Sequence, residues 1–250
     1  MCGRYVITST PEAIRNLFGY PDQPNFPPRY NVAPTQPIPV VLWEEGARRF
    51  RLMRWGLLPS WVKDPQAFSL LINARGESAV EKPAFRNAMK RRRCLIPADG
   101  FYEWKPDGAR KRPHFVRMRD AAPFAFAGLW ETWTGPNGEE MDTVAIVTTT
   151  ASPDIAHIHE RMPVMLEPDA FQLWLDCAQV DATTAQAVLV PTRPGKLEAI
   201  EVSTAVNRVA NDSAALIAPS SRDPLEPPEP APAKRAAKTK PADKRQGSLF

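Results

Sequence analysis

The sequence predicts an α+β fold built on an antiparallel, barrel-like sheet with a few short helices, followed by a disordered C-terminal tail. Strand-like runs outnumber helix-like runs, and tight turns join most of them. From about Ser220 the composition changes to Pro, Ala, Lys and Glu without an apolar period, so nothing there offsets the entropy of ordering. We expect one domain over residues 1–219, a disordered linker over 220–245 and a terminal peptide over 246–250.

The first element along the chain is expected to be a helix. Thr10 can serve as its N-cap, Pro11 suits the first helical position, and Gly19 is a natural stop. The buried stripe of this helix would be Ile14, Leu17 and Phe18. Residues 24–31 then read as extended, irregular chain.

Two strand-like runs follow, Ile38–Trp43 and Arg49–Trp55, and the short segment between them predicts a hairpin. Residues 65–81 show only weak periodicity. Phe85–Arg93 is expected to be a helix, because its apolar residues are four apart, and it ends in a basic run.

The rest of the domain reads mainly as strands separated by turns that carry Pro and Gly. Pro168–Leu175 has the spacing of a short amphipathic helix. The strand candidates are His114–Arg119, Phe124–Trp133, Thr143–Thr149 and Ala199–Val202.

Composition limits the class of protein. Of the 250 residues, 43% are hydrophobic, which is enough for a substantial core. There is no apolar run of about 18 residues, and the N-terminus does not resemble a secretory signal. The cysteines, Cys2, Cys94 and Cys177, are odd in number and scattered, which argues against a disulfide framework or a cysteine zinc site. We expect a cytoplasmic protein without membrane contact, metal or cofactor.

The net charge of +4 does not by itself indicate nucleic-acid binding. Residues 222–250 hold seven basic and four acidic side chains, so they contribute +3 and leave +1 for the remainder. A nucleic-acid site in the domain must therefore be a local patch. Basic and aromatic residues that suit single-stranded nucleic acid, or equally a solvated surface, are Arg4, Arg54, Trp61, Arg75, Arg86, Arg91–Arg93 and Arg161.

Cys2 directly follows the initiator methionine, which aminopeptidase is expected to remove because the next side chain is small. Cys2 would then carry an α-amine and a thiol, with reference pKa values of about 7.7–8.0 and about 8.5. Such a 1,2-aminothiol reacts preferentially with an aldehyde: the amine forms a Schiff base and the thiol closes a thiazolidine ring. Taken alone, Cys2 is more simply interpreted as a small apolar residue near a terminus.

Two segments place polar residues among apolar ones. Asn73 and Arg75 follow an apolar pair, where a capping Asn and a surface Arg would be the simplest interpretation. Glu103 stands between large aromatics, and on a strand it shares a face with Phe101. Partial desolvation there would suit Glu103 to general acid catalysis, while a salt bridge on an exposed strand is equally compatible.

His157 and His159 lie close to Arg161. The His-x-His spacing could form one edge of a metal site, but no third ligand stands nearby, so we do not expect one. A histidine that acts as general acid–base, with Arg161 binding an anion, is the better functional interpretation, and a turn with one buried histidine is the alternative. His114 is expected to be structural.

In this order, these stretches resemble the SOS-response-associated peptidase (SRAP) family of abasic-site processing proteins over roughly residues 1–218. Gly76 departs from the small side chain expected at its position, and His157 is an additional histidine. The segments that carry the resemblance are Met1–Tyr5, Arg29–Pro34, Trp55–Pro59, Ile72–Arg75, Arg93–Trp104, Ile158–Pro163 and Val202–Asn207.

The resemblance implies a single barrel-like domain with a basic groove for single-stranded DNA, where the N-terminal cysteine forms a thiazolidine cross-link with an abasic site. It assigns Cys2 as nucleophile, Glu103 and His159 as acid–base groups, and Asn73 as the residue beside the linkage. The expected DNA contacts are Arg4, Asn31, Trp61, Arg75 and Arg161.

The resemblance also implies self-processing peptidase activity and an association with replicating DNA. Because a Schiff base at C1′ acidifies the C2′ proton, abasic-site lyase activity is expected to compete with ring closure. We expect a monomer. Two alternatives stay open on the residues. One is a cysteine peptidase or N-terminal-nucleophile hydrolase that uses Cys2 with His159 on a peptide bond. The other is a DNA-binding module without catalysis.

The chain ends in Gln246-Gly247-Ser248-Leu249-Phe250, which resembles the pentapeptide that docks on the bacterial sliding clamp. Leu249 and Phe250 would supply two apolar anchors, and Gln246 a hydrogen-bonding side chain. A chance match is the alternative interpretation.

Overall fold

Five strands close into a barrel in this computed structural model, which describes residues 2–220. The barrel strands are β3 (Pro37–Glu44), β4 (Ala47–Trp55), β6 (Arg93–Ala98), β9 (Phe124–Thr134) and β10 (Glu140–Thr150). Antiparallel pairing runs in the order β4, β3, β6, β9, β10. A short parallel pairing of β10 with β4, where Thr143 lies opposite Arg54, closes the ring. The predicted α+β fold with a barrel-like core is thus confirmed.

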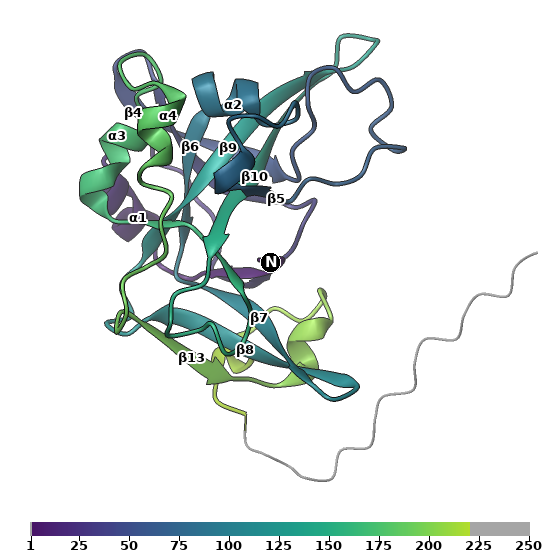
Figure 1. Ribbon diagram of the computed structural model, residues 1–250, viewed down its shortest axis with the longest axis vertical. Coiled ribbons are helices and arrows are strands. Elements are labelled where there is room, and N and C mark those ends of the chain that lie inside the picture. Colours follow the sequence, from purple (N-terminus) through teal and green to yellow (C-terminus); the bar gives the residue numbers. More distant parts are fainter. Residues whose placement is uncertain (1, 221–250) are drawn as a thin grey trace, which may run out of the picture. The chain divides into compact units, whose positions relative to one another are not determined.

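A second sheet lies beside the barrel, in the strand order β13-β8-β7-β1-β2. Its long hairpin and β13 occupy the lower part of Figure 1, with the N-terminal strand between them and the barrel. Gly100 is needed at the start of the hairpin, because a Cβ there would lie 2.3 Å from the Phe115 ring. The strands are β1 (Tyr5–Ile7), β2 (Arg29–Val32), β7 (Gly100–Asp107), β8 (Arg110–Met118) and β13 (Leu197–Glu201).

Short helices cover the other end of the barrel, at the top of Figure 1. α1 (Pro11–Phe18) has the predicted ends: Thr10 Oγ1 accepts from the N–H of Ala13 at 3.2 Å, and Gly19 adopts φ +65°. Phe18 of α1 stacks on Phe171 at 5.1 Å between ring centroids. The other helices are α2 (Arg86–Arg91), α3 (Phe171–Leu175) and α4 (Ala182–Gln186).

The predicted hairpin at residues 38–55 is confirmed, with a tight turn at Glu45 and Gly46, both at positive φ. Residues 24–31 are expected to be irregular, but residues 29–31 belong to strand β2 (Arg29–Val32), which pairs with β1. β5 (Asn73–Arg75), β11 (Arg161–Pro163) and β12 (Met165–Leu166) were not predicted, because strands of two or three residues show no alternation of their own.

Arg93 is a structural residue and not the end of a basic helix. It lies in β6 and is 2% exposed. Its guanidinium donates to the carbonyl oxygens of Trp174 at 2.6 Å, Met89 at 2.9 Å and Val180 at 2.8 Å. Because these acceptors surround it, Arg93 joins α2 and α3 to the barrel and is not available to DNA.

No helix within residues 2–220 is both long and apolar enough to cross a membrane. In the same range, no cluster of three or more histidine, cysteine or acidic residues has the arrangement to hold a metal ion. The predicted linker and the terminal peptide with Gln246, Leu249 and Phe250 lie outside the described residues.

Candidate active site

Cys2 lies just before β1 and is fully buried, in the hydrophobic cluster that contains Trp55 and Phe101. Its Sγ is 3.8 Å from the carbonyl oxygen of Arg4. Burial raises the pKa of the Cys2 thiol, and the negative charge of Glu103 raises it further. The thiol is therefore protonated at neutral pH. Because the charge of Glu103 acts on it, the two predicted site residues lie near one another.

Glu103 and His159 face one another. Glu103 lies on β7 on the same face as Phe101 and is 3% exposed, so the predicted desolvation of this carboxyl is present. The Nε2 atom of His159, in the loop before β11, is 3.6 Å from Oε1 of Glu103. His157 is exposed, which leaves His159 as the histidine at the carboxylate.

The hydrogen bonds of His159 indicate where its ring carries the proton. The main-chain N–H of Arg161 donates to Nδ1 at 3.0 Å. The Arg161 carbonyl oxygen lies 3.2 Å from the same Nδ1, but an amide N–H can only donate, so Nδ1 serves as the acceptor. The neutral ring then carries its proton on Nε2, which faces Glu103. The pair is thereby arranged to pass a proton between carboxyl and imidazole.

Asn73 lies on β5, which pairs in parallel with β10 and sets Asn73 opposite Ile146. Both polar atoms of its carboxamide are buried, and neither has a hydrogen-bond partner within residues 2–220. Each buried polar group without a partner costs roughly 1–3 kcal/mol. An amide kept at that cost is a strong candidate for binding a ligand.

A surface cavity of about 510 Å³ opens at the acid–base pair. It is lined by Glu103, Trp104, Lys111, His159 and Asn207. The indole N–H of Trp104 donates to Oδ1 of Asn207 at 2.9 Å, which fixes one wall. Lys111 and Asn207 were not singled out in the sequence, because they come near Glu103 only through the β7–β8 hairpin and the turn after β13.

Hydrogen bonds from Arg4 and Asn31 support the cavity wall that contains Asn207. The Arg4 guanidinium donates to Oδ1 of Asn31 at 2.8 Å and to the carbonyl oxygens of Val206 at 2.8 Å and Asn207 at 3.3 Å. Asn31 is 1% exposed, and its amide donates to three main-chain oxygens of residues 206–211. Direct DNA contact by Asn31 would require that segment to move.

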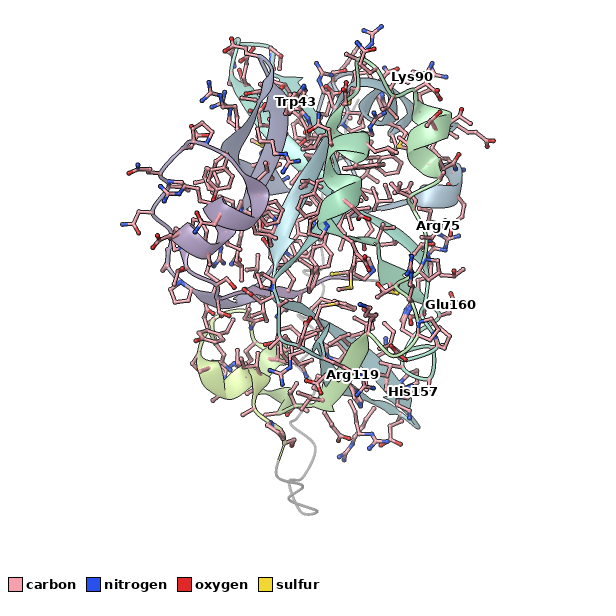
Figure 2. The ribbon with its side chains drawn as sticks, turned by 90° about the vertical axis from the view of Figure 1, so that its left-hand side faces the viewer. Trp43, Arg75, Lys90, Arg119, His157 and Glu160 are labelled. Atoms are coloured by element: carbon pink, nitrogen blue, oxygen red, sulfur yellow. The ribbon has the colours of Figure 1, made fainter. Side chains whose placement is uncertain are left out.

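The other predicted DNA contacts lie at the surface or near it. Trp61 is 58% exposed, with its ring edge-on to Phe68 at 5.6 Å between centroids. Arg75 is exposed at the end of β5. Figure 2 shows Arg75, Glu160 and His157 along one side of the domain, so β5 and the loop before β11 share a surface. The Arg161 guanidinium is paired with the Glu77 carboxylate, with 2.8 Å between Nη2 and Oε2.

Comparison with known proteins identifies the family of this chain. Residues 1–209 match the family SOS response associated peptidase (SRAP). The chain is 39% identical over 221 residues to the abasic site processing protein YoaM of Bacillus subtilis (strain 168), covering 87% of this chain and 97% of that protein. It is 31% identical to the abasic site processing protein YedK of Escherichia coli (strain K12), covering 88% of this chain and 100% of that protein.

Solved structures give the same fold. A protein from Bordetella bronchiseptica, 27% identical, superposes with a TM-score of 0.71 over 81% of this chain and 100% of its own. A protein from Bacteroides thetaiotaomicron superposes with a TM-score of 0.79 over 88% of this chain and 100% of its own, at 23% identity. The family resemblance of the motifs is confirmed, and this chain belongs to the SOS response associated peptidase (SRAP) family.

Proposed function

We propose that this protein recognises abasic sites in single-stranded DNA and forms a covalent thiazolidine cross-link with them through Cys2, after loss of Met1. The observation that carries the proposal is the placement of Cys2 in the electrostatic reach of Glu103, which itself faces His159. The names of the relatives, abasic site processing proteins, support the choice of substrate. The product would shield the lesion.

The proposed reaction begins when the sugar of the abasic site opens and exposes C1′ as an aldehyde. The Cys2 amine adds to C1′, and the carbinolamine loses water once its hydroxyl is protonated by the Glu103–His159 pair. The thiol sulfur then adds to C1′ of the Schiff base, while its proton passes to the nitrogen. The ring closes with the net loss of one water and no other reagent.

The raised pKa of the Cys2 thiol supports this order of steps. A thiol that stays protonated is a weak nucleophile, so the amine attacks first and sulfur follows when its proton can leave. The Schiff base also acidifies the C2′ proton, so β-elimination, the lyase activity, competes with ring closure. Self-processing would act on the Met1–Cys2 peptide bond and supply the amine.

The peptidase alternative is less well supported by the site. A cysteine peptidase requires a thiolate, which needs a lowered thiol pKa. Burial raises the pKa of Cys2 instead. In a peptidase this thiol would have to make the first attack, whereas in the proposed reaction the amine attacks the aldehyde first and the sulfur follows.

The test compares one preparation on four substrates: abasic single-stranded DNA, the same strand reduced with borohydride, the intact strand and a peptide. A denaturant-resistant, gel-shifted species should form with the first substrate alone, because reduction converts the aldehyde to an alcohol that no amine can attack. Equal cross-linking to the reduced strand, or cleavage of the peptide without any cross-link, would contradict the proposal.

The second part of the proposal concerns the terminal peptide, which docks the protein on the sliding clamp and so brings it to cytoplasmic replication sites. Leu249 and Phe250 are the expected apolar anchors and Gln246 the polar one. A labelled peptide of residues 240–250 should bind purified clamp, and the same peptide with Leu249→Ala and Phe250→Ala should not. The absence of measurable binding by the unchanged peptide would remove this part and leave the cross-linking chemistry untouched.

A further inference from the structure

Arg161 and Glu77 form a bidentate ion pair beside the acid–base pair. The Nη1 and Nη2 atoms of Arg161 donate to Oε1 and Oε2 of Glu77 at 3.0 and 2.8 Å. Such a bidentate pair fixes the guanidinium in one plane as well as in position. Nη2 also donates to the carbonyl oxygen of Thr148 at 2.8 Å. The Arg161 side chain is 12% exposed and the Glu77 side chain 51%, so the guanidinium is held inside and the carboxylate closes it from the surface.

The Arg161–Glu77 ion pair spans strand β10. On one side β10 pairs with β5, where Thr148 lies opposite Arg75, and on the other side with β11, where Thr150 lies opposite Arg161. Figure 1 shows β5 beside β10, and Glu77 lies in the short 3₁₀ helix Gly76–Ser78 directly after β5. The Arg161 side chain thus crosses Thr148 and joins the segment that carries His159 to the segment that carries Asn73.

Arg161 acts on the imidazole through its main chain. While its side chain is paired with Glu77, the main-chain N–H of Arg161 donates to Nδ1 of His159 at 3.0 Å. The segment that carries Glu77 is anchored to α4, where Nε2 of Gln186 donates to the carbonyl oxygens of Gly76 at 3.0 Å and Glu77 at 3.2 Å. Partial burial raises the pKa of Glu77, but the hydrogen bonds and charge of Arg161 outweigh it and hold the pKa below its ordinary value. The carboxylate is therefore charged at neutral pH.

We propose that Glu77 is a positioning residue for the cross-linking reaction: through Arg161 it holds the His159 imidazole against Glu103 and keeps β5, with Asn73, aligned to it. Glu77 does not line the cavity at the acid–base pair. The inference rests on the proposed function, because its rate readout is the cross-link. A carboxylate that merely screened Arg161 from DNA phosphates would produce the opposite result, a gain on removal.

The experiment compares Glu77→Gln with Glu160→Gln. Each removes one negative charge near His159, and Glu160 is an exposed neighbour in sequence on the side shown in Figure 2. In single turnovers at saturating abasic DNA, Glu77→Gln should react about 10-fold more slowly, with its DNA Kd within about twofold of that of Glu160→Gln. Glu160→Gln should react at the wild-type rate. Glu77→Asp, which keeps the charge, should recover part of the loss.

A second readout does not depend on DNA. The ring ¹⁵N shifts of His159 in the folded protein should report a protonated Nε2 in the wild type and a mixture of tautomers in Glu77→Gln. Unchanged ring shifts together with a wild-type rate would overturn the inference, and so would faster cross-linking with tighter DNA binding. If the wild type forms no cross-link, the proposed function fails, and the ring shifts alone decide whether Glu77 positions His159.

Discussion

Replacement of Cys2 by alanine is expected to abolish the heat-stable cross-link to abasic single-stranded DNA, to below about one hundredth of the wild-type yield. Alanine keeps the α-amine and is small enough for Met1 to be removed, so only the sulfur is lost. Without sulfur the Schiff base cannot close into a thiazolidine, and it returns to amine and aldehyde when the sample is heated.

The same variant separates the amine from the thiol. With cyanoborohydride present, hydride reduces the Schiff base C=N bond to a stable amine, so Cys2→Ala should again give a covalent product. Without the reductant it should cleave more abasic strand than the wild type, because ring closure no longer diverts β-elimination. The readout is a denaturing gel that resolves both the cross-linked species and the cleaved strand.

Cys177→Ala is the control for loss of a different free thiol, because Cys177, unlike the buried Cys2, is partly exposed and lies away from the N-terminus. It should cross-link at the wild-type level. A heat-stable product from Cys2→Ala without reductant, or loss of the product from Cys177→Ala, would place the reactive sulfur elsewhere and refute the mechanism.

The parts of the fold that follow from local rules could be predicted from the sequence. α1 depends on the Thr10 cap, Pro11 and the Gly19 stop, and the β3–β4 hairpin on alternation and a short turn. β5 could not be predicted, because Asn73–Arg75 becomes a strand only by pairing with β10, far along the chain. Arg93 was assigned to a helix end for the same reason: the carbonyls that bind it at Trp174 and Val180 follow more than eighty residues later.

The candidate site divides in a similar way. Cys2, Asn73, Glu103 and His159 stand in the motifs that carry the family resemblance, so the resemblance singles them out where each residue alone does not. The approach of His159 Nε2 to Glu103 Oε1 at 3.6 Å could not be predicted, since it depends on how the second sheet meets the loop before β11. The role of Glu77 was missed because its partner Arg161 lies 84 residues away and an acid after Arg75-Gly76 carries no signal by itself.

Replacement of Glu103 by glutamine is expected to slow cross-link formation by about 10²-fold, the lower range for loss of a general acid–base group, while DNA affinity stays within about twofold. Glutamine keeps the size of the side chain and can still accept a hydrogen bond from His159, but it cannot gain or release a proton near neutral pH. The measurement is the single-turnover rate with saturating abasic DNA, beside a separate binding curve on intact single strands.

The effect of changing a buried side chain on stability must be separated from the effect of losing proton transfer, because Glu103 is 3% exposed and any change there can affect folding. Glu131 on β9 is the matched control: it is also a buried glutamate, 5% exposed, and it is paired with Arg92 away from the cavity. Glu131→Gln should reduce thermal stability at least as much as Glu103→Gln but leave the rate unchanged. A 10²-fold rate loss corresponds to about 2.7 kcal/mol of transition-state stabilisation. If Glu103→Gln instead lost rate and DNA binding in equal proportion, Glu103 would be a structural residue, and proton transfer would fall to His159 alone.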